Sequence, residues 1–253
     1  MVRTRVIPCL LLKNLGLVKT VRFKHPTYVG DPINAVRIFN DKEVDELVFL
    51  DITATLERRP PPFKLIAKIA SECFMPFCYG GGIRSLEHVT QLFTLGVEKV
   101  ALNSAAAESP RFVNEVASVA GSQSVVVSID VKRNLFGRYR VYTRSGTTRT
   151  ENDPVDYARR MQDSGAGEVL LTSIDRDGTM TAYDLELIQR VSAAVSLPVV
   201  ACGGASQIGD FVAAVDAGAS AAAAGSLFVF TGKHRAVLIN FPAPQDLQLA
   251  FAS

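Results

Sequence analysis

The chain contains 253 residues, 48% of which are hydrophobic, and its formal net charge is +2. A chain of this length and apolar content can bury a large core, so we expect one domain spanning residues 1–253. The small net charge argues against nucleic acid or an anionic membrane as a partner, and no apolar run reaches the length of about eighteen residues that a membrane-spanning helix needs. We therefore expect a soluble, cytoplasmic protein.

The four cysteines and three histidines form no recognisable metal-binding or catalytic motif. The cysteines are scattered without a C-x-x-C pair, and no histidine stands at the spacing of a zinc site or a catalytic triad. We expect buried free thiols, no bound metal and no cofactor.

Apolar runs alternate with helix-start signals along the chain. The run at residues 5–12 predicts a buried strand, and residues 13–30 are expected to form a long loop. Asp31-Pro32 combines a capping residue with a proline suited to the first helical turn, so a helix should begin there. The remaining expected strands cover residues 46–51, 76–79, 99–102, 124–133, 168–172, 198–202 and 220–224. The remaining expected helices cover residues 62–72, 85–95, 110–119, 154–163, 185–194 and 208–217.

Two stretches depart from this alternation. Residues 136–150 predict an inserted β-hairpin around Ser145-Gly146. Near the end of the chain, Pro242 and Pro244 are expected to interrupt any final helix. The eight strand–helix units favour an α/β (βα)8 TIM barrel, with its active site at the carboxyl ends of the strands. A doubly wound open sheet is the alternative.

One glycine-rich phrase occurs in both halves of the chain. Gly80-Gly81-Gly82 with Asn103-Ser104 in the first half is echoed by Gly203-Gly204 with Gly225-Ser226, about half the chain length later. This repeat favours a barrel built from two (βα)4 half-barrels. A lone glycine pair more often marks a tight turn, but glycines followed one strand later by a hydroxyl residue can surround a phosphate with backbone N–H groups. Two matched phrases therefore predict two phosphate pockets.

Several carboxylates are expected at the mouth of the barrel. Aligning the two halves places Leu11 opposite Asp130, and it places Asp51 near Asp175 and Asp177. Such aspartates often only cap a following loop. Asp130 directly follows a buried run, so we interpret it as a general acid or base beside the bound phosphates.

Residues 5 to about 230 resemble one known family, the HisF cyclase subunit of imidazole glycerol phosphate synthase. The matching motifs are residues 46–54 (ELVFLDITA), 80–83 (GGGI), 121–133 (GSQSVVVSIDVKR) and 170–179 (LLTSIDRDGT). In that family, a lyase-type cyclase converts PRFAR and ammonia to imidazole glycerol phosphate and AICAR in histidine biosynthesis. The ammonia comes from a HisH-type glutaminase bound at the base of the barrel and travels along the barrel axis.

The resemblance assigns roles to residues of this chain. It implies that Asp130 is catalytic, and that an ammonia gate at the base is formed by Arg5, Glu46, Lys99 and Glu168. It implies one phosphate site at Gly82, Asn103 and Ser104. It implies a second phosphate site at Asp177, Gly178, Gly204, Gly225 and Ser226.

The chain departs from the family pattern at strand one, where the family's other catalytic aspartate corresponds to Leu11. Its first strand resembles instead a HisF-like branch from bacterial surface-polysaccharide gene sets. The leading hypothesis is therefore an ammonia-channelling subunit that works with a HisH-like glutaminase and a sugar amidotransferase to amidinate an N-acetyl sugar in lipopolysaccharide (O-antigen) biosynthesis. One alternative is an imidazole glycerol phosphate synthase cyclase that uses Asp51, Asp175 or Asp177 in place of the missing acid. A second is a non-catalytic ammonia conduit that activates the glutaminase.

Overall fold

The computed structural model describes residues 4–232 and 234–252. Within these residues, eight parallel strands follow one another from β10 to β7 in the strand order, and they close into a barrel because β7 also pairs with β10. The barrel strands, in chain order, are β1 (Arg5–Lys13), β4 (Leu47–Asp51), β5 (Phe77–Gly80), β6 (Lys99–Leu102), β7 (Val125–Arg133), β10 (Glu168–Ser173), β11 (Val199–Cys202) and β12 (Ala221–Ala224). The predicted TIM barrel is confirmed.

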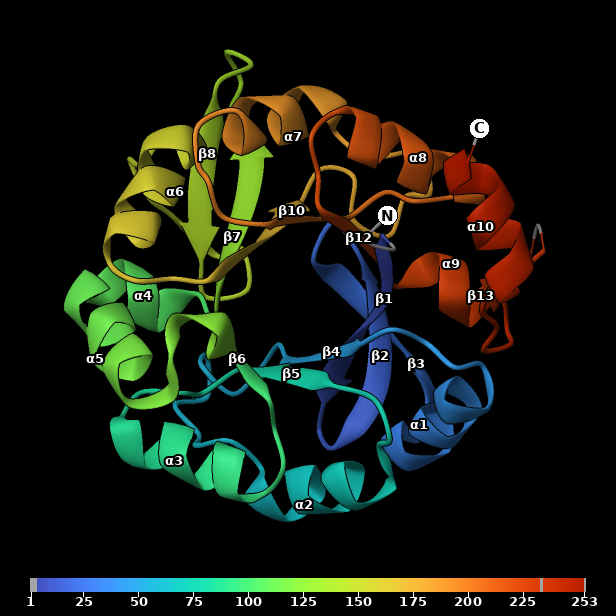
Figure 1. Cartoon of the computed structure of the whole chain (residues 1–253), viewed down its shortest axis with the longest axis horizontal. Helices are drawn as coiled ribbons and strands as arrows, with labels where there is room; N and C mark the ends of the chain where they lie inside the picture. The colour runs from blue at the N-terminus through green and yellow to red at the C-terminus, as the bar shows by residue number, and fades with distance from the viewer. Residues whose placement is uncertain (1–3, 233, 253) are drawn as a thin grey trace.

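Helices surround the barrel as a ring (Figure 1). They are α1 (Pro32–Asp41), α2 (Phe63–Glu72), α3 (Leu86–Thr94), α5 (Pro110–Ala120), α6 (Pro154–Asp163), α7 (Leu185–Ser192) and α8 (Ile208–Asp216), with short α4 (Ser104–Glu108) and α9 (Ser226–Val229) at strand ends and α10 (Pro244–Ala252) near the C-terminus. The cap predicted at Asp31 is present, since its carboxylate accepts hydrogen bonds from the N–H groups of Ile33 and Asn34.

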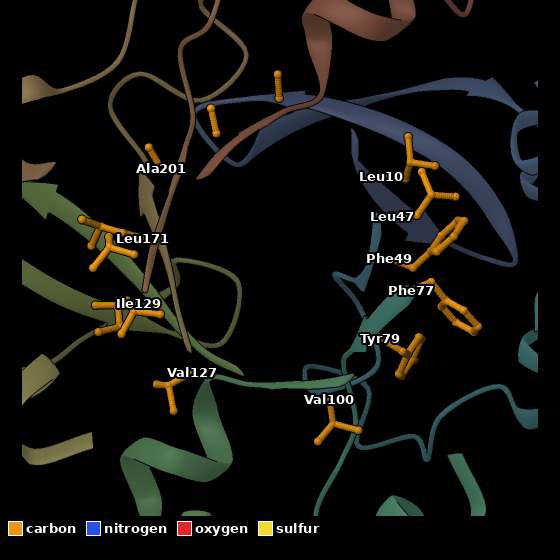
Figure 2. Close-up of a cluster of buried hydrophobic side chains, with 14 of the residues drawn as sticks. Leu10, Leu47, Phe49, Phe77, Tyr79, Val100, Val127, Ile129, Leu171 and Ala201 are labelled. Atoms are coloured by element: carbon orange, nitrogen blue, oxygen red, sulfur yellow. The ribbon is translucent and has the colours of Figure 1, made fainter. Parts of the chain in front are cut away.

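The strand side chains divide into two apolar layers, because successive residues of a strand point to opposite faces. Outward residues pack against the helices; Figure 2 shows Phe49, Phe77 and Tyr79 in this layer, with the rings of Phe49 and Phe77 edge to face at 6.2 Å. Inward residues, among them Ile7 and Cys78, fill the barrel interior. Each strand therefore appears in the sequence as a continuous apolar run, which explains why the strands could be predicted from the sequence.

The loop predicted over residues 13–30 is wrong. The segment forms β2 (Gly16–Val21) and β3 (Lys24–Gly30), an antiparallel extension of β1 with Leu11 opposite Val18. The turn between β1 and β2 contains Asn14 and Leu15, whose φ angles are 50° and 65°. Such a turn is usually marked by Asn-Gly, and leucine gives no signal for it.

Three helices were also missed, among them the four-residue α9 (Ser226–Val229). The five-residue α4 begins at Ser104 and was not predicted, and α10 begins at Pro244, where the sequence argument expected an interruption. Proline fits the first turn of a helix, because the N–H groups there have no intrahelical acceptor, whereas it breaks a helix from an interior position. Pro244 can therefore begin α10. The predicted hairpin is confirmed as β8 (Tyr139–Thr143) and β9 (Thr148–Arg149). None of the helices in the described ranges is long and apolar enough to cross a membrane.

Candidate functional site

A cavity of about 1160 Å³, open to solvent, lies at the carboxyl ends of the barrel strands. We call it the mouth cavity. It brings together every residue predicted for catalysis or phosphate binding. These are Gly82, Asn103, Ser104, Asp130, Asp177, Gly178, Gly204, Gly225 and Ser226. Leu11 and Asp51 line it as well, whereas Asp175 does not and instead accepts a hydrogen bond from the N–H of Arg133 at 2.9 Å.

Gly82, Asn103 and Ser104, which we call the first cradle, lie where β5 and β6 end. The φ angle of Gly82 is +72°, and a Cβ there would lie 2.6 Å from the carbonyl oxygen of Arg59, so only glycine fits. Ser104 opens α4, and its Oγ accepts a hydrogen bond from the N–H of Arg144 at 3.0 Å. Because the backbone of Arg59 passes so close, Gly82 is also needed for the tight turn after β5, which is the structural role that a glycine pair most often has.

Asp177, Gly178, Gly204, Gly225 and Ser226 form the second cradle, near the ends of β10, β11 and β12. A Cβ on Gly178 would lie 2.0 Å from the carbonyl oxygen of Thr20, and one on Gly225 would lie 2.0 Å from Nζ of Lys19. Lys19 therefore reaches into this cradle from β2. Its side chain is buried, and its Nζ makes no hydrogen bond or ion pair with any described residue. A buried, unpaired ammonium group at this position suits an anionic ligand.

Asp130 lies on β7, beside Thr172 of β10, and is buried at the bottom of the mouth cavity. Its carboxylate accepts a hydrogen bond from Nδ2 of Asn103 at 3.2 Å. Burial and the neighbouring charge of Asp177 raise the pKa of Asp130 to about 7. A carboxyl group with this pKa can both donate and accept a proton near neutral pH.

The other acidic side chains of the cavity differ in their partners. The Asp51 carboxylate accepts hydrogen bonds from the N–H groups of Thr53 at 3.0 Å and Ala54 at 2.9 Å, and it pairs with Arg59 at 3.3 Å. It therefore caps the loop after β4. Asp177 accepts a hydrogen bond from the hydroxyl of Thr20 at 3.1 Å. Leu11, in the first-strand position, supplies no group that can exchange a proton.

The four residues predicted for the base lie at the amino ends of the strands and form a closed ring of ion pairs. Lys99 Nζ lies 3.0 Å from Glu46 and 2.9 Å from Glu168, and Arg5 contacts the same two carboxylates. Both glutamates are buried. Burial opposes the charge on Lys99, but the two carboxylates outweigh it and raise its pKa, so the group stays charged. We call these residues the base ring.

Sequence reasoning missed part of the lining. Phe23, Ser145 and Met180 line the mouth cavity from hairpin turns and a long loop, and they carry no motif that could have identified them. The four cysteines are free thiols, as predicted, but only Cys9, Cys78 and Cys202 are buried, and Cys73 is partly exposed. Cys9 and Cys202 line the cavity. Among the described residues, no three His, Cys, Asp or Glu side chains are grouped so as to hold a metal ion.

Comparisons with known proteins agree with this geometry. Residues 5–235 match the family model for "Histidine biosynthesis protein". A protein of Pseudomonas aeruginosa, provisionally named imidazole glycerol phosphate synthase subunit hisF2, is 53% identical over 98% of this chain and 100% of its own length. A similarly named HisF protein of Leptospira interrogans is 45% identical over 99% of this chain and 100% of its own. The imidazole glycerol phosphate synthase subunit HisF of Alkaliphilus metalliredigens is 46% identical over 90% of this chain and 91% of its own.

Proposed function

This chain belongs to the histidine biosynthesis protein family, and we propose that it is a HisF-type synthase subunit that receives ammonia at the base of its barrel and uses it on a phosphorylated substrate at the mouth. One observation carries the proposal. A closed ring of four paired charges lies at one end of the barrel, and a buried carboxyl group with a pKa near 7 lies in a cavity at the other end.

The barrel interior between these ends suits neutral ammonia. Its inward side chains are small or apolar, among them Cys78, Ala101 and Val200. An ammonium ion would lose its hydration there without gaining a counter-ion, whereas the neutral molecule loses far less. The base ring supplies polar groups at the entrance, and its charges compensate one another. A HisH-type glutaminase docked on this face would deliver ammonia directly into the barrel.

The first candidate reaction is the cyclisation of imidazole glycerol phosphate synthase, which the names of the relatives support. In this reaction Asp130 would move the proton, and the two cradles would hold the two phosphates of the substrate. Asp177 would act as the second acid/base group, since Asp51 is paired with Arg59 and Asp175 does not line the cavity. Lys19 would neutralise the phosphate in the second cradle.

Leu11 favours a second candidate. The cavity has an apolar side chain on β1, so a reaction that needs two acid/base groups on opposite strands would lose a factor of roughly 10² to 10⁴ in rate. The second candidate is therefore a complex in which ammonia is passed on to amidinate an N-acetyl sugar, as in O-antigen biosynthesis. A sugar amidotransferase would be the third partner.

One experiment separates the candidates. The purified chain is given PRFAR and an ammonium salt, and the release of AICAR is followed for the wild type and for Leu11→Asp. Under the cyclase proposal Asp177 already serves as the second carboxylate, so the wild type turns over at an ordinary enzyme rate and Leu11→Asp changes that rate little. No turnover by either protein would overturn the cyclase proposal. Glutamine-dependent amidination after co-purification with the glutaminase and the amidotransferase would then support the second candidate.

A further inference from the structure

A second, polar pocket adjoins the first cradle. We call it the arginine pocket. It occupies about 610 Å³, including its open side, and its lining includes Thr55, Arg58, Arg84, Ser104, Glu108 and Arg144. Thr55 and Ser104 also line the mouth cavity, so the two spaces meet at the first cradle. Three guanidinium groups and one carboxylate make up the charged lining of this pocket in the described part of the chain.

Hydrogen bonds fix the side chain of Arg84 and the backbone of Arg144. Arg84 Nη2 donates a hydrogen bond to the carbonyl oxygen of Thr55 at 3.2 Å. Arg144 sits in the turn between β8 and β9, where its N–H donates to Oγ of Ser104 at 3.0 Å. The adjacent Ser145 hydroxyl donates to the carbonyl oxygen of Ile52 at 2.6 Å, which ties this turn to the loop after β4. The inserted hairpin therefore positions Arg144 directly beside the first cradle.

The positive charge of the pocket is not compensated within the described residues. The guanidinium groups of Arg58 and Arg144 make no hydrogen bond or ion pair with other described side chains, and neither does the carboxylate of Glu108. The neighbouring Arg59 provides a contrast, because it pairs with both Asp51 and Glu57. Guanidinium groups bind phosphoryl oxygens through paired, charge-assisted hydrogen bonds.

We propose that the first cradle and the arginine pocket together bind a diphosphate group. The cradle takes one phosphoryl group, and Arg84 and Arg144 take the next phosphoryl group of the same phosphoanhydride. The ligand at this side of the mouth is then a diphosphate-bearing small molecule, such as a nucleoside diphosphate derivative. Such a ligand fits the second candidate function and not PRFAR, whose two phosphates are separate monoesters. The inference rests on the proposed function only for the role of the first cradle as a phosphate site.

The test compares inorganic pyrophosphate with inorganic phosphate by isothermal titration calorimetry on the full chain. The wild type should bind pyrophosphate at least about tenfold more tightly than phosphate. Arg84→Gln and Arg144→Gln should each weaken pyrophosphate binding roughly tenfold or more, with less effect on phosphate, because each removes a charge-assisted contact to the outer phosphoryl group. Arg111→Gln is the control. Arg111 is exposed on α5, and among the described residues it pairs only with Glu115, at 2.9 Å, so its loss should change neither affinity.

Equal affinity of the wild type for the two anions would overturn the inference. So would arginine variants that bind pyrophosphate as well as Arg111→Gln does, since pyrophosphate would then bind elsewhere. Circular dichroism confirms that each variant is folded. Binding of the glutaminase, measured on the same variants, involves the opposite end of the barrel. If the wild type does not bind the glutaminase, that result counts against the proposed function but does not affect the conclusion about pyrophosphate binding.

Discussion

Replacing Asp130 by asparagine should make the protein more stable at neutral pH while removing the carboxyl group that we propose transfers the proton. Asp130 is buried, and the nearby carboxylate of Asp177, which has the same charge, also raises its pKa. Its ionised form therefore lowers the stability of the folded state. Asparagine has nearly the same shape, carries no charge, and can keep a hydrogen bond with Asn103.

The size and the pH range of this effect follow from the pKa. Asp130 titrates at about 7 in the folded protein, whereas an unfolded aspartate titrates near 4. This difference of roughly three pKa units corresponds to at most about 4 kcal/mol of unfolding free energy. Below about pH 4 the carboxyl group is protonated in both states, so the penalty is absent. Between about pH 4 and 7 the unfolded chain loses its proton first, so the folded wild type loses stability as the pH rises.

Urea denaturation of the wild type and Asp130→Asn at pH 4.5, 6 and 8 measures this effect. The variant should exceed the unfolding free energy of the wild type by only about 1 kcal/mol at pH 4.5 and by up to about 4 kcal/mol at pH 8. Asp51→Asn is the matched control, because that buried carboxylate has Arg59 as a partner, and its loss should destabilise the protein at pH 8. A difference between Asp130→Asn and wild type that does not change with pH would refute the reasoning.

Two further predictions concern the base ring and the second cradle. Glu168→Gln should lower the unfolding free energy by about 2 kcal/mol or more, because it leaves Arg5 and Lys99 to share Glu46, and it should reduce glutamine-driven activity more than ammonium-driven activity. The control, Glu72→Gln, removes an exposed pair with Arg37 and should change the unfolding free energy by less than about 1 kcal/mol. Equal effects of the two substitutions would contradict the prediction. Gly178→Ala should lower the unfolding free energy measured in urea by more than about 1 kcal/mol, because the φ angle of Gly178 is +71° and the new Cβ would clash with the carbonyl oxygen of Thr20. The control, Gly209→Ala, lies in α8, where a Cβ would have no neighbour within 4 Å, and it should be neutral or stabilising. A Gly178 variant as stable as this control would show that the clash is easily relieved.

Local signals were enough for most of the barrel. The strands are buried on both faces and so appear as apolar runs, and a helix such as α6 is marked by Asp153 as cap and Pro154 in the first turn. These local signals failed where a turn or a helix forms without the residue that usually marks it. The turn at Asn14 and Leu15 adopts positive φ angles without a glycine, and the short α4 has no capping side chain.

The site shows the same division. The glycine repeat and the carboxylate at the end of a buried run pointed to the glycines and serines of both cradles and to Asp130, which line one cavity. The roles of Asp177 and Gly178 in the second cradle were implied only by the family resemblance. The arginine pocket could not be foreseen, because it depends on where an inserted hairpin folds back, and that position is set by contacts between residues 40 or more positions apart, such as Arg144 with Ser104. The buried position of Lys19 depends in the same way on the hairpin that sequence reasoning took for a loop.

The sequence by itself determined the alternation of strands and helices, the repeat of its two halves and the presence of leucine at position 11, because these depend on residue type and spacing along the chain. Only the tertiary structure decided what the charged groups can do. The pKa of Asp130 depends on its burial and on Asp177, and the base ring depends on four strands that begin at one end of the barrel. Electrostatic energies depend on distance and on exclusion of water, and both are established only when remote segments meet.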